Sequence, residues 1–176
     1  VGSASHGQQT AAMLGLLEES FLRHKPDWVL VYGDTNSTLA AAVAAVKIHQ
    51  RLAHLEAGLR SFNRRMPEEH NRIVVDHLSE LLFAPTKITK SNLQCEKVHG
   101  KIFVTGNTVI DAINIYSKIS RKKSKLSITS SDFILFTLHR SENVDNKKIL
   151  SSIIDFPLAI DITAIACACR SVGNPG

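Results

Sequence analysis

Residues 28–48 read WVLVYGDTNSTLAAAVAAVKI, and this stretch decides the fold. Its first five residues are apolar throughout, as in a β-strand that is covered on both faces. A polar turn follows, in which Thr35, Asn36 and Ser37 can cap a helix, and an alanine-rich helical pattern then runs from residue 36 to 49. A buried strand that passes through a short turn into a helix is the first half of a β-α-β unit, which predicts a parallel sheet.

The same theme repeats on both sides of this stretch. Further strands are expected at 52–55, 81–84 and 102–104, and helices at 8–24, 67–80, 88–98 and 108–117. The alternation with short connections predicts an α/β fold with right-handed crossovers and helices on both faces of a Rossmann-like parallel sheet.

A second α/β unit is expected near residue 131, where the apolar run 133–137 begins another strand. Between the units, residues 118–130 hold five basic residues and no acidic one, which accounts for the whole net charge of +5 of the 176-residue chain. A basic cluster confined to one segment is typical of a solvated linker rather than of a nucleic-acid surface. We therefore expect most of a first domain at 1–118, a linker at 119–130 and the start of a second domain at 131–176.

The remaining composition excludes several classes of protein. The three cysteines form no CxxC pair, which argues against a disulfide framework and a zinc site and favours a reducing, cytoplasmic compartment. No run of 18 apolar residues predicts a membrane span. After a helix expected at 146–154, residues 156–168 form an apolar run without a clear pattern, which needs a neighbour to cover it.

Four polar clusters fall at expected strand ends or helix starts. Asp34 follows the first strand, Glu56 follows the second, Glu68 opens the next helix, and His139 follows the strand of the second unit. Because ligands bind outside the carboxyl ends of strands in open α/β sheets, two facing units would place these clusters around one cleft.

Each cluster also has a structural explanation. Asp34 could simply cap a helix. Glu56 could be paired with Arg60. Glu68 or Glu69 could act only on the helix dipole. A lone His139 is more often structural than catalytic. The coincidence of the four clusters, rather than any one of them, favours a functional site.

The chain resembles the non-hydrolysing UDP-N-acetylglucosamine 2-epimerases. The resemblance is carried, in order, by VYGDTNSTLAAA, HLEAGLRSFNRRMPEEHNR, VTGNTVIDA and TLHRSEN, and extends from about Val1 to Ile154. It implies a two-domain fold of the glycosyltransferase-B type, here incomplete at both ends. The family's first strand with its GTRPE-type loop and its later Ser-Gly-Gly segment are absent. From about Asp155 the resemblance stops, which a truncation or a shifted reading frame would explain.

The resemblance also implies a reaction. The family interconverts UDP-N-acetylglucosamine and UDP-N-acetylmannosamine, without a cofactor or metal, by eliminating UDP to give 2-acetamidoglucal and adding it back. Which carboxylate is base and which is acid stays open. Alternatives are an inactive remnant or a hydrolysing UDP-N-acetylglucosamine 2-epimerase. The implied setting is cytoplasmic supply of cell-surface polysaccharide by a homodimer, with neither nucleic acid nor membrane as partner. Carried over by motif, the catalytic residues are Asp34, Glu56, Glu68 and His139, and the substrate-binding residues are Arg60, Arg72, His139, Arg140 and Glu142.

Overall fold

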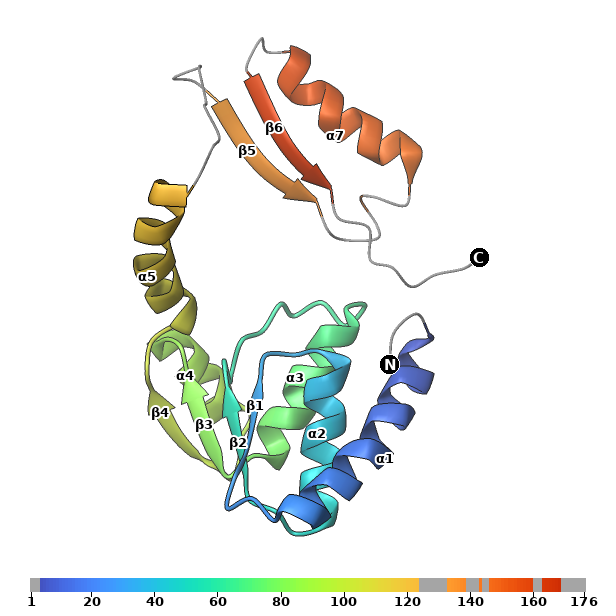
Figure 1. Ribbon diagram of the computed structural model, residues 1–176, viewed down its shortest axis with the longest axis vertical. Helices are drawn as coiled ribbons and strands as arrows, with labels where there is room; N and C mark the ends of the chain where they lie inside the picture. The colour runs from blue at the N-terminus through green and yellow to red at the C-terminus, as the bar shows by residue number, and fades with distance from the viewer. Residues whose placement is uncertain (1–3, 124–132, 139–142, 144–145, 160–162, 169–176) are drawn as a thin grey trace. The chain divides into compact units, whose positions relative to one another are not determined.

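A computed structural model describes residues 4–123, 133–138, 143, 146–159 and 163–168 (Figure 1). The chain divides into two compact units, Val1–Lys118 and Ile119–Gly176. Each unit is an α/β structure built on parallel strands. None of the helices in the described part of the chain has the length and hydropathy needed to span a membrane.

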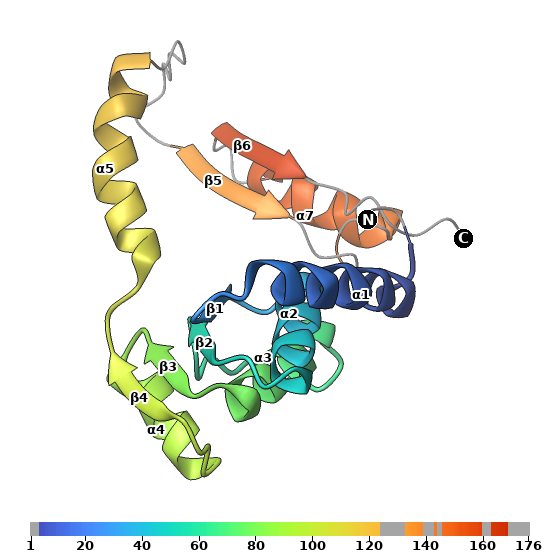
Figure 2. The same cartoon turned by 60° about the horizontal axis from the view of Figure 1, so that its bottom comes forward.

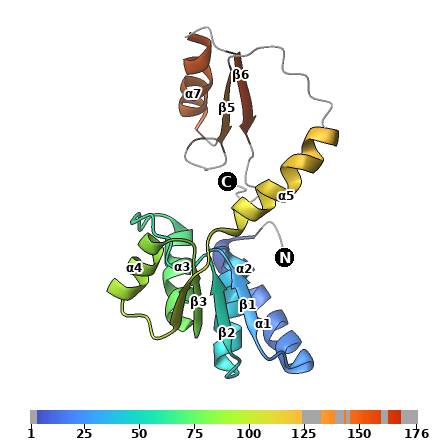
Figure 3. The same cartoon turned by 90° about the vertical axis from the view of Figure 1, so that its left-hand side faces the viewer.

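The first unit contains a four-stranded sheet in the order β1-β2-β3-β4, with every neighbouring pair parallel (Figures 1 and 3). Its strands are β1 (Val29–Tyr32), β2 (Leu52–Leu55), β3 (Leu81–Ala84) and β4 (Lys101–Val104). Its helices are α1 (His6–His24), α2 (Asn36–Lys47), α3 (Pro67–Leu78) and α4 (Lys87–Cys95), and α5 (Thr108–Lys123) follows β4. The expected alternation of strands and helices is therefore confirmed.

The three crossover helices α2, α3 and α4 pack on one face of the sheet, not on both faces as the sequence predicts. Val29 and Leu52 lie in register on neighbouring strands and share a buried cluster with residues of α2 and α3. His54 lies two residues after Leu52 and so on the same face of the sheet. Leu82 lies in register with His54 and packs against Leu93 of α4, which places α4 on this face as well. Strands that follow each other in spatial order through right-handed crossovers place every crossover helix on the same side.

The opposite face of this sheet is only partly covered by the described residues. Leu30 is 58% exposed, Tyr32 48% and Phe103 46%. The rings of Phe83 and Phe103 stack at the far side, with centroids 6.0 Å apart. Burial along β1 thus alternates, although its uniformly apolar sequence predicts cover on both faces.

Alanine lets α2 sit close to three neighbours. Ala40, Ala42, Ala44 and Ala45 are all completely buried. The helix contacts β1, α3 and α1, and Figures 1 and 2 both show α1 running alongside it. Small side chains allow such close approach. Because α2 and α3 each follow a parallel strand, their N-termini lie at the same edge of the sheet.

Helix α5 is longer than the sequence predicts. It runs to Lys123 rather than to residue 117, so that the first five residues of the expected linker are helical. Arg121, Lys122 and Lys123 lie in its last turn, where cations interact favourably with the helix dipole. The next residues of the expected linker lie outside the described part of the chain.

The second unit contains two parallel strands, β5 (Phe133–Leu138) and β6 (Thr163–Ala168), joined through α7 (Lys147–Ala159). The register runs from Phe133 opposite Thr163 to Leu138 opposite Ala168. The apolar run 156–168, which has no clear pattern in the sequence, therefore contains the end of α7 and the whole of β6. A near-continuous apolar sequence is typical of parallel strands.

Candidate active site at the strand ends of the first unit

Three of the predicted site residues lie at one edge of the first sheet. Asp34 follows β1, Glu56 follows β2, and Glu68 lies in the first turn of α3. A Cβ atom on Gly33 would lie 3.6 Å from Glu56 Oε2, and the Asn71 side chain of α3 donates to the Asp34 carbonyl at 2.8 Å. The structure thus places these three residues at the edge that the strand-end rule predicts for a ligand.

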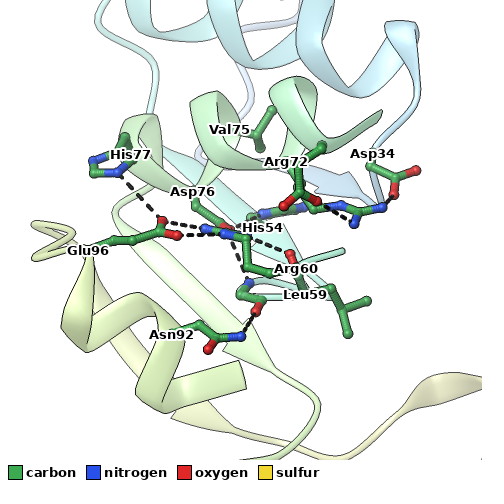
Figure 4. Close-up of polar contacts among 12 residues, drawn as sticks. Asp34, His54, Leu59, Arg60, Arg72, Val75, Asp76, His77, Asn92 and Glu96 are labelled. Carbon is green, nitrogen blue, oxygen red and sulfur yellow. Dashed lines mark hydrogen bonds and ion pairs between the residues drawn. The ribbon is translucent and has the colours of Figure 1, made fainter. Parts of the chain in front are cut away.

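Asp34 is held by a cation and does not cap α2. The cap is Thr35, whose side chain accepts a hydrogen bond from the Thr38 backbone N–H. The Asp34 carboxylate is instead paired with the guanidinium of Arg72 (Figure 4). The helix-capping explanation for Asp34 is thus wrong. Its carboxylate lies just beyond the C-terminal end of β1.

Arg72 joins two carboxylates. One terminal nitrogen pairs with Asp34, and the other lies 2.9 Å from Glu69 Oε2. Its Nε is buried and has no hydrogen-bond partner among the described residues. An arginine in this position fixes Asp34 against α3.

Glu56 has an unusual backbone conformation. Its φ of +68° lies in the left-handed region, which costs an L-residue about 1–2 kcal/mol. Its carboxylate accepts a hydrogen bond from the Tyr32 hydroxyl at 3.1 Å, and that hydroxyl also lies 2.6 Å from Thr108 Oγ1. Non-glycine residues in strained conformations gather at functional sites.

Glu68 faces a pocket of about 320 Å³ at the same edge. The walls come from the N-terminal ends of three helices, and helix N-termini favour anionic ligands. Among the described residues, no group of three or more His, Cys, Asp or Glu side chains is placed to hold a metal ion. The pocket is lined by His6, Gln9, Met13, Thr35, Asn36, Ser37, Glu68 and Asn71.

Arg60 does not lie in this site, which corrects its assignment to substrate binding. Its guanidinium is fully buried and lies 2.8 Å from Asp76 and 2.5 Å from Glu96 (Figure 4). Burial by itself would lower the pKa of Arg60, but the bonds and charges of Glu96 and Asp76 outweigh burial and raise it. Since Arg60 is committed to these two acids, it is also not the partner of Glu56.

Glu69 lies next to these residues, and the sequence suggests for it only an interaction with the helix dipole. It is 1% exposed and accepts hydrogen bonds from the Ser61 and Phe62 backbone N–H groups, both at 2.9 Å. It thereby ties the loop after β2 to α3. The signal was the spacing of Glu69, Arg72 and Asp76, which places three charged residues on one buried helix face.

The environment of Glu69 makes the first unit acid-sensitive. Burial alone would raise the pKa of Glu69, but the hydrogen bonds from Ser61 and Phe62 and the charge of Arg72 lower it below its ordinary value. The folded-state pKa is thus below the unfolded-state value. The carboxylate stabilises the fold above the unfolded-state value, and this contribution is lost as the pH falls through the folded-state pKa.

We therefore expect Glu69→Gln to lower the free energy of unfolding at pH 7 by about 2 kcal/mol, because it replaces charge-assisted hydrogen bonds. The loss of stability on acidification below about pH 4.5 should be smaller in the variant than in the parent. Urea unfolding monitored by the fluorescence of the single tryptophan, Trp28, measures both effects. The control is Glu19→Gln, at an exposed ion pair with Arg23; equal pH dependence of both variants would contradict the prediction.

His139, Arg140 and Glu142, the predicted residues of the second unit, lie outside the described residues. Their assignment stays a prediction. Asp34, Glu56, Glu68 and Arg72 are the predicted residues that the structure brings together.

Comparisons with known proteins show the family of the chain. The profile of a family described as UDP-N-acetylglucosamine 2-epimerase matches residues 1–167, which continues past Asp155, where the resemblance was expected to stop. The UDP-N-acetylglucosamine 2-epimerase of Methanocaldococcus jannaschii is 49% identical over 162 residues, 88% of this chain and 44% of that protein. A UDP-2,3-diacetamido-2,3-dideoxy-D-glucuronate 2-epimerase of Pseudomonas aeruginosa is 47% identical over 159 residues, with the same two coverages.

A solved structure matches over nearly the whole chain. The crystal structure of the M. jannaschii UDP-GlcNAc 2-epimerase in complex with UDP-GlcNAc and UDP superimposes with a TM-score of 0.87 and 45% identity, covering 97% of this chain and 50% of that one. The chain spans about half the length of the curated relatives it matches.

Proposed function

Because the chain belongs to the UDP-N-acetylglucosamine 2-epimerase family, we propose that it supplies the catalytic carboxylates of an isomerase that interconverts UDP-N-acetylglucosamine and UDP-N-acetylmannosamine. The observation that carries the proposal is the position of Asp34, Glu56 and Glu68 at one strand-end edge of the sheet, with Arg72 paired to Asp34. The M. jannaschii relative with bound UDP-GlcNAc and UDP supports the choice of substrate.

The chemistry requires acids and bases on both faces of the sugar. The C2 proton is not adjacent to a carbonyl, so it leaves together with UDP: a base takes the proton, the C1–O bond to the diphosphate breaks, and a C1=C2 double bond forms. UDP then adds back to C1 while an acid delivers a proton to the other face of C2. Asp34 is bound by a guanidinium and Glu56 by a phenol, and carboxylates in different environments can divide these roles.

The proposed substrate-binding residues come from two parts of the sequence. Arg72 holds Asp34 in place, and its guanidinium is the proposed cation of this edge for an anionic substrate. His139, Arg140 and Glu142 are proposed to bind the diphosphate and sugar. Stabilisation of the departing UDP anion by His139 and Arg140 would lower the barrier of the elimination step.

A second candidate substrate is UDP-2,3-diacetamido-2,3-dideoxy-D-glucuronate. The P. aeruginosa relative that is named for this substrate is almost as similar to the chain as the M. jannaschii relative. The same elimination and re-addition would serve it. We further propose a homodimer in the cytoplasm that provides activated amino sugars for cell-surface polysaccharide.

The test measures by NMR how fast deuterium from D₂O is incorporated at C2 of the sugar. It is carried out with each of the two candidate nucleotide sugars. It compares the 176-residue chain with a chimaera in which residues 1–167 replace the matching half of the M. jannaschii enzyme. We expect the chimaera to exchange the C2 proton of UDP-N-acetylglucosamine and to form UDP-N-acetylmannosamine. Exchange by the chimaera alone would mean that the isolated chain is inactive, and free N-acetylmannosamine as the main product would indicate a hydrolase. A folded chimaera that exchanges neither sugar would overturn the proposal.

A further inference from the structure

The hydroxyl group of Tyr32 connects Glu56 to the start of α5. It lies 3.1 Å from Glu56 Oε1 and 2.6 Å from Thr108 Oγ1. Tyr32 and Thr108 are 76 residues apart in the sequence, and both belong to the first unit. Within the described part of the chain, no other group forms a hydrogen bond with the Glu56 side chain. The orientation of this carboxyl group therefore depends on Tyr32.

The place of Tyr32 follows from the sheet. Tyr32 is the last residue of β1 and lies in register with Leu55, the last residue of β2. Glu56 comes next in the chain, with its φ of +68°. Because parallel strands end at the same edge, a ring fixed in β1 holds its hydroxyl group beside the end of β2.

The VTGNTVIDA motif, which the proposed function leaves without a role, gives Thr108 its place. It begins at the end of β4. Gly106 has a φ of +86°, a conformation that favours glycine. Asn107 Oδ1 then accepts a hydrogen bond from the Val109 backbone N–H at 2.9 Å, as the side chain of an N-cap residue does. Thr108 is thereby the first residue of α5, where its hydroxyl group meets that of Tyr32.

The hydroxyl groups of Tyr32 and Thr108, the hydroxyl pair, suit a carboxyl group that gains and loses a proton. Each hydroxyl group has one proton to donate and can also accept. When Glu56 is a carboxylate, Thr108 can donate to Tyr32 while Tyr32 donates to Glu56. When Glu56 carries the proton, both bonds can reverse, because rotation of the two hydroxyl groups is sufficient. The same contacts therefore hold both forms of the carboxyl group.

Water can also reach this carboxyl group, because Tyr32 is 48% exposed. A water molecule satisfies a hydrogen bond but leaves the side-chain torsion angles of Glu56 free, whereas Tyr32 is fixed by β1. Proton transfer needs such alignment, since displacement of a reacting group by about 1 Å can reduce the rate by about 100-fold. The hydroxyl pair thus contributes orientation that solvent does not.

We propose that Tyr32 is a positioning residue, supported by Thr108, that orients Glu56 in both protonation states of its carboxyl group. The positioning role rests on the proposed function of Glu56 as an acid or a base. The existence of the hydroxyl pair does not, so the two parts of the proposal are tested separately.

The hydroxyl pair is tested by NMR of the 176-residue chain labelled with ¹³C at Cζ of tyrosine. The chain has two tyrosines, Tyr32 and Tyr116, and Tyr32→Phe assigns their signals. We expect Thr108→Val to shift the Tyr32 signal, because the hydroxyl group loses a partner, and to leave the Tyr116 signal in place. A Tyr32 signal at the same position in the parent and in Thr108→Val would overturn the hydroxyl pair, whether or not the protein turns over a nucleotide sugar.

The positioning role is measured in the chimaera. We expect Tyr32→Phe to lower kcat on UDP-N-acetylglucosamine by about 10- to 100-fold with little change in KM, because the ring remains and the alignment of Glu56 is lost. Thr108→Val should lower kcat by about 2- to 10-fold, the effect of one neutral hydrogen bond, and Thr108→Ser should recover most of this loss. The matched control is Tyr116→Phe, at an exposed position of α5, which should keep the parental kcat.

The double variant Tyr32→Phe/Thr108→Val separates positioning from a general loss of structure. Because Thr108 acts through Tyr32, its kcat should lie within about twofold of that of Tyr32→Phe, whereas independent defects multiply. Multiplied effects, or equal kcat values of Tyr32→Phe and Tyr116→Phe, would overturn the positioning role. A parent chimaera without exchange at C2 would overturn the proposed function and the positioning role with it, and the NMR signal of Tyr32 would still decide the hydroxyl pair.

Discussion

Glu56→Gln is expected to reduce kcat of the chimaera on UDP-N-acetylglucosamine by about 100- to 10,000-fold, the usual contribution of a positioned acid or base. Glutamine has nearly the same shape and can still accept the hydrogen bond from Tyr32, but it cannot take or deliver a proton. Because the amide keeps the backbone and the contacts of the strand end, KM should change far less than kcat. Deuterium exchange at C2 should fall together with turnover, since both need the same proton transfer.

The fold of the variant is monitored by Trp28, which lies at the start of β1 with the Arg51 guanidinium 3.7 Å above its ring. Its fluorescence and thermal midpoint should match those of the parent. Glu19→Gln, on the exposed surface of α1, serves as the matched substitution. Near-normal turnover of Glu56→Gln would remove Glu56 from the reaction.

Gly58→Ala is expected to have the largest effect on stability, lowering the free energy of unfolding by about 3 kcal/mol. Gly58 has a φ of +81°, which is strained for alanine. A Cβ atom there would also lie 2.3 Å from the Thr89 carbonyl oxygen and 2.8 Å from Leu93 Cγ, both on α4. Because the nearest contact is backbone, α4 would have to move away from the sheet, and the Gly58 N–H would lose its bond to Asp76.

Gly15→Ala is the matched control, since it lies within α1 with no atom near the added Cβ. Alanine is the better helix former, so this variant should gain up to about 1 kcal/mol. Urea unfolding of both variants, followed by Trp28 fluorescence, measures the two opposite effects. Equal stability of Gly58→Ala and its parent would show that the loop after β2 relaxes freely.

The local part of the fold can be read from the sequence. The bounds of β2 and β3 are predicted to the residue, because short apolar runs there end at clear turn residues. Helix ends are less accurate: α4 begins at Lys87 because Thr86 forms a capping box with Thr89. Helix α5 continues to Lys123, since nothing in residues 118–123 breaks a helix.

The long-range arrangement of the helices and strands could not be predicted from the sequence in the same way. The distribution of helices over the sheet depends on strand order, which periodicity does not contain. The apolar run 156–168 is interpretable only once β6 is seen to pair with β5. Pro157 lies within α7, against its ordinary preference.

In the candidate site, too, local features are predicted from the sequence and long-range contacts are not. Asp34, Glu56 and Glu68 are predicted because strand ends in a parallel sheet converge on one edge. The motif also suggests Arg60, yet its partners Asp76 and Glu96 are distant in sequence, and only the packing of α3 and α4 shows that it is buried. Glu69 differs from Glu68 by one helix position, which turns it from the pocket to the loop after β2.

The left-handed backbone of Glu56 has a consequence for the evolution of this position. Glycine would adopt the same φ of +68° without strain, so selection for thermal stability alone favours its appearance there. Under the proposed function, selection for proton transfer favours the carboxylate in spite of its strain. Thermal stability and catalytic activity therefore favour different residues at position 56. A homologue with glycine there would have gained stability and lost activity.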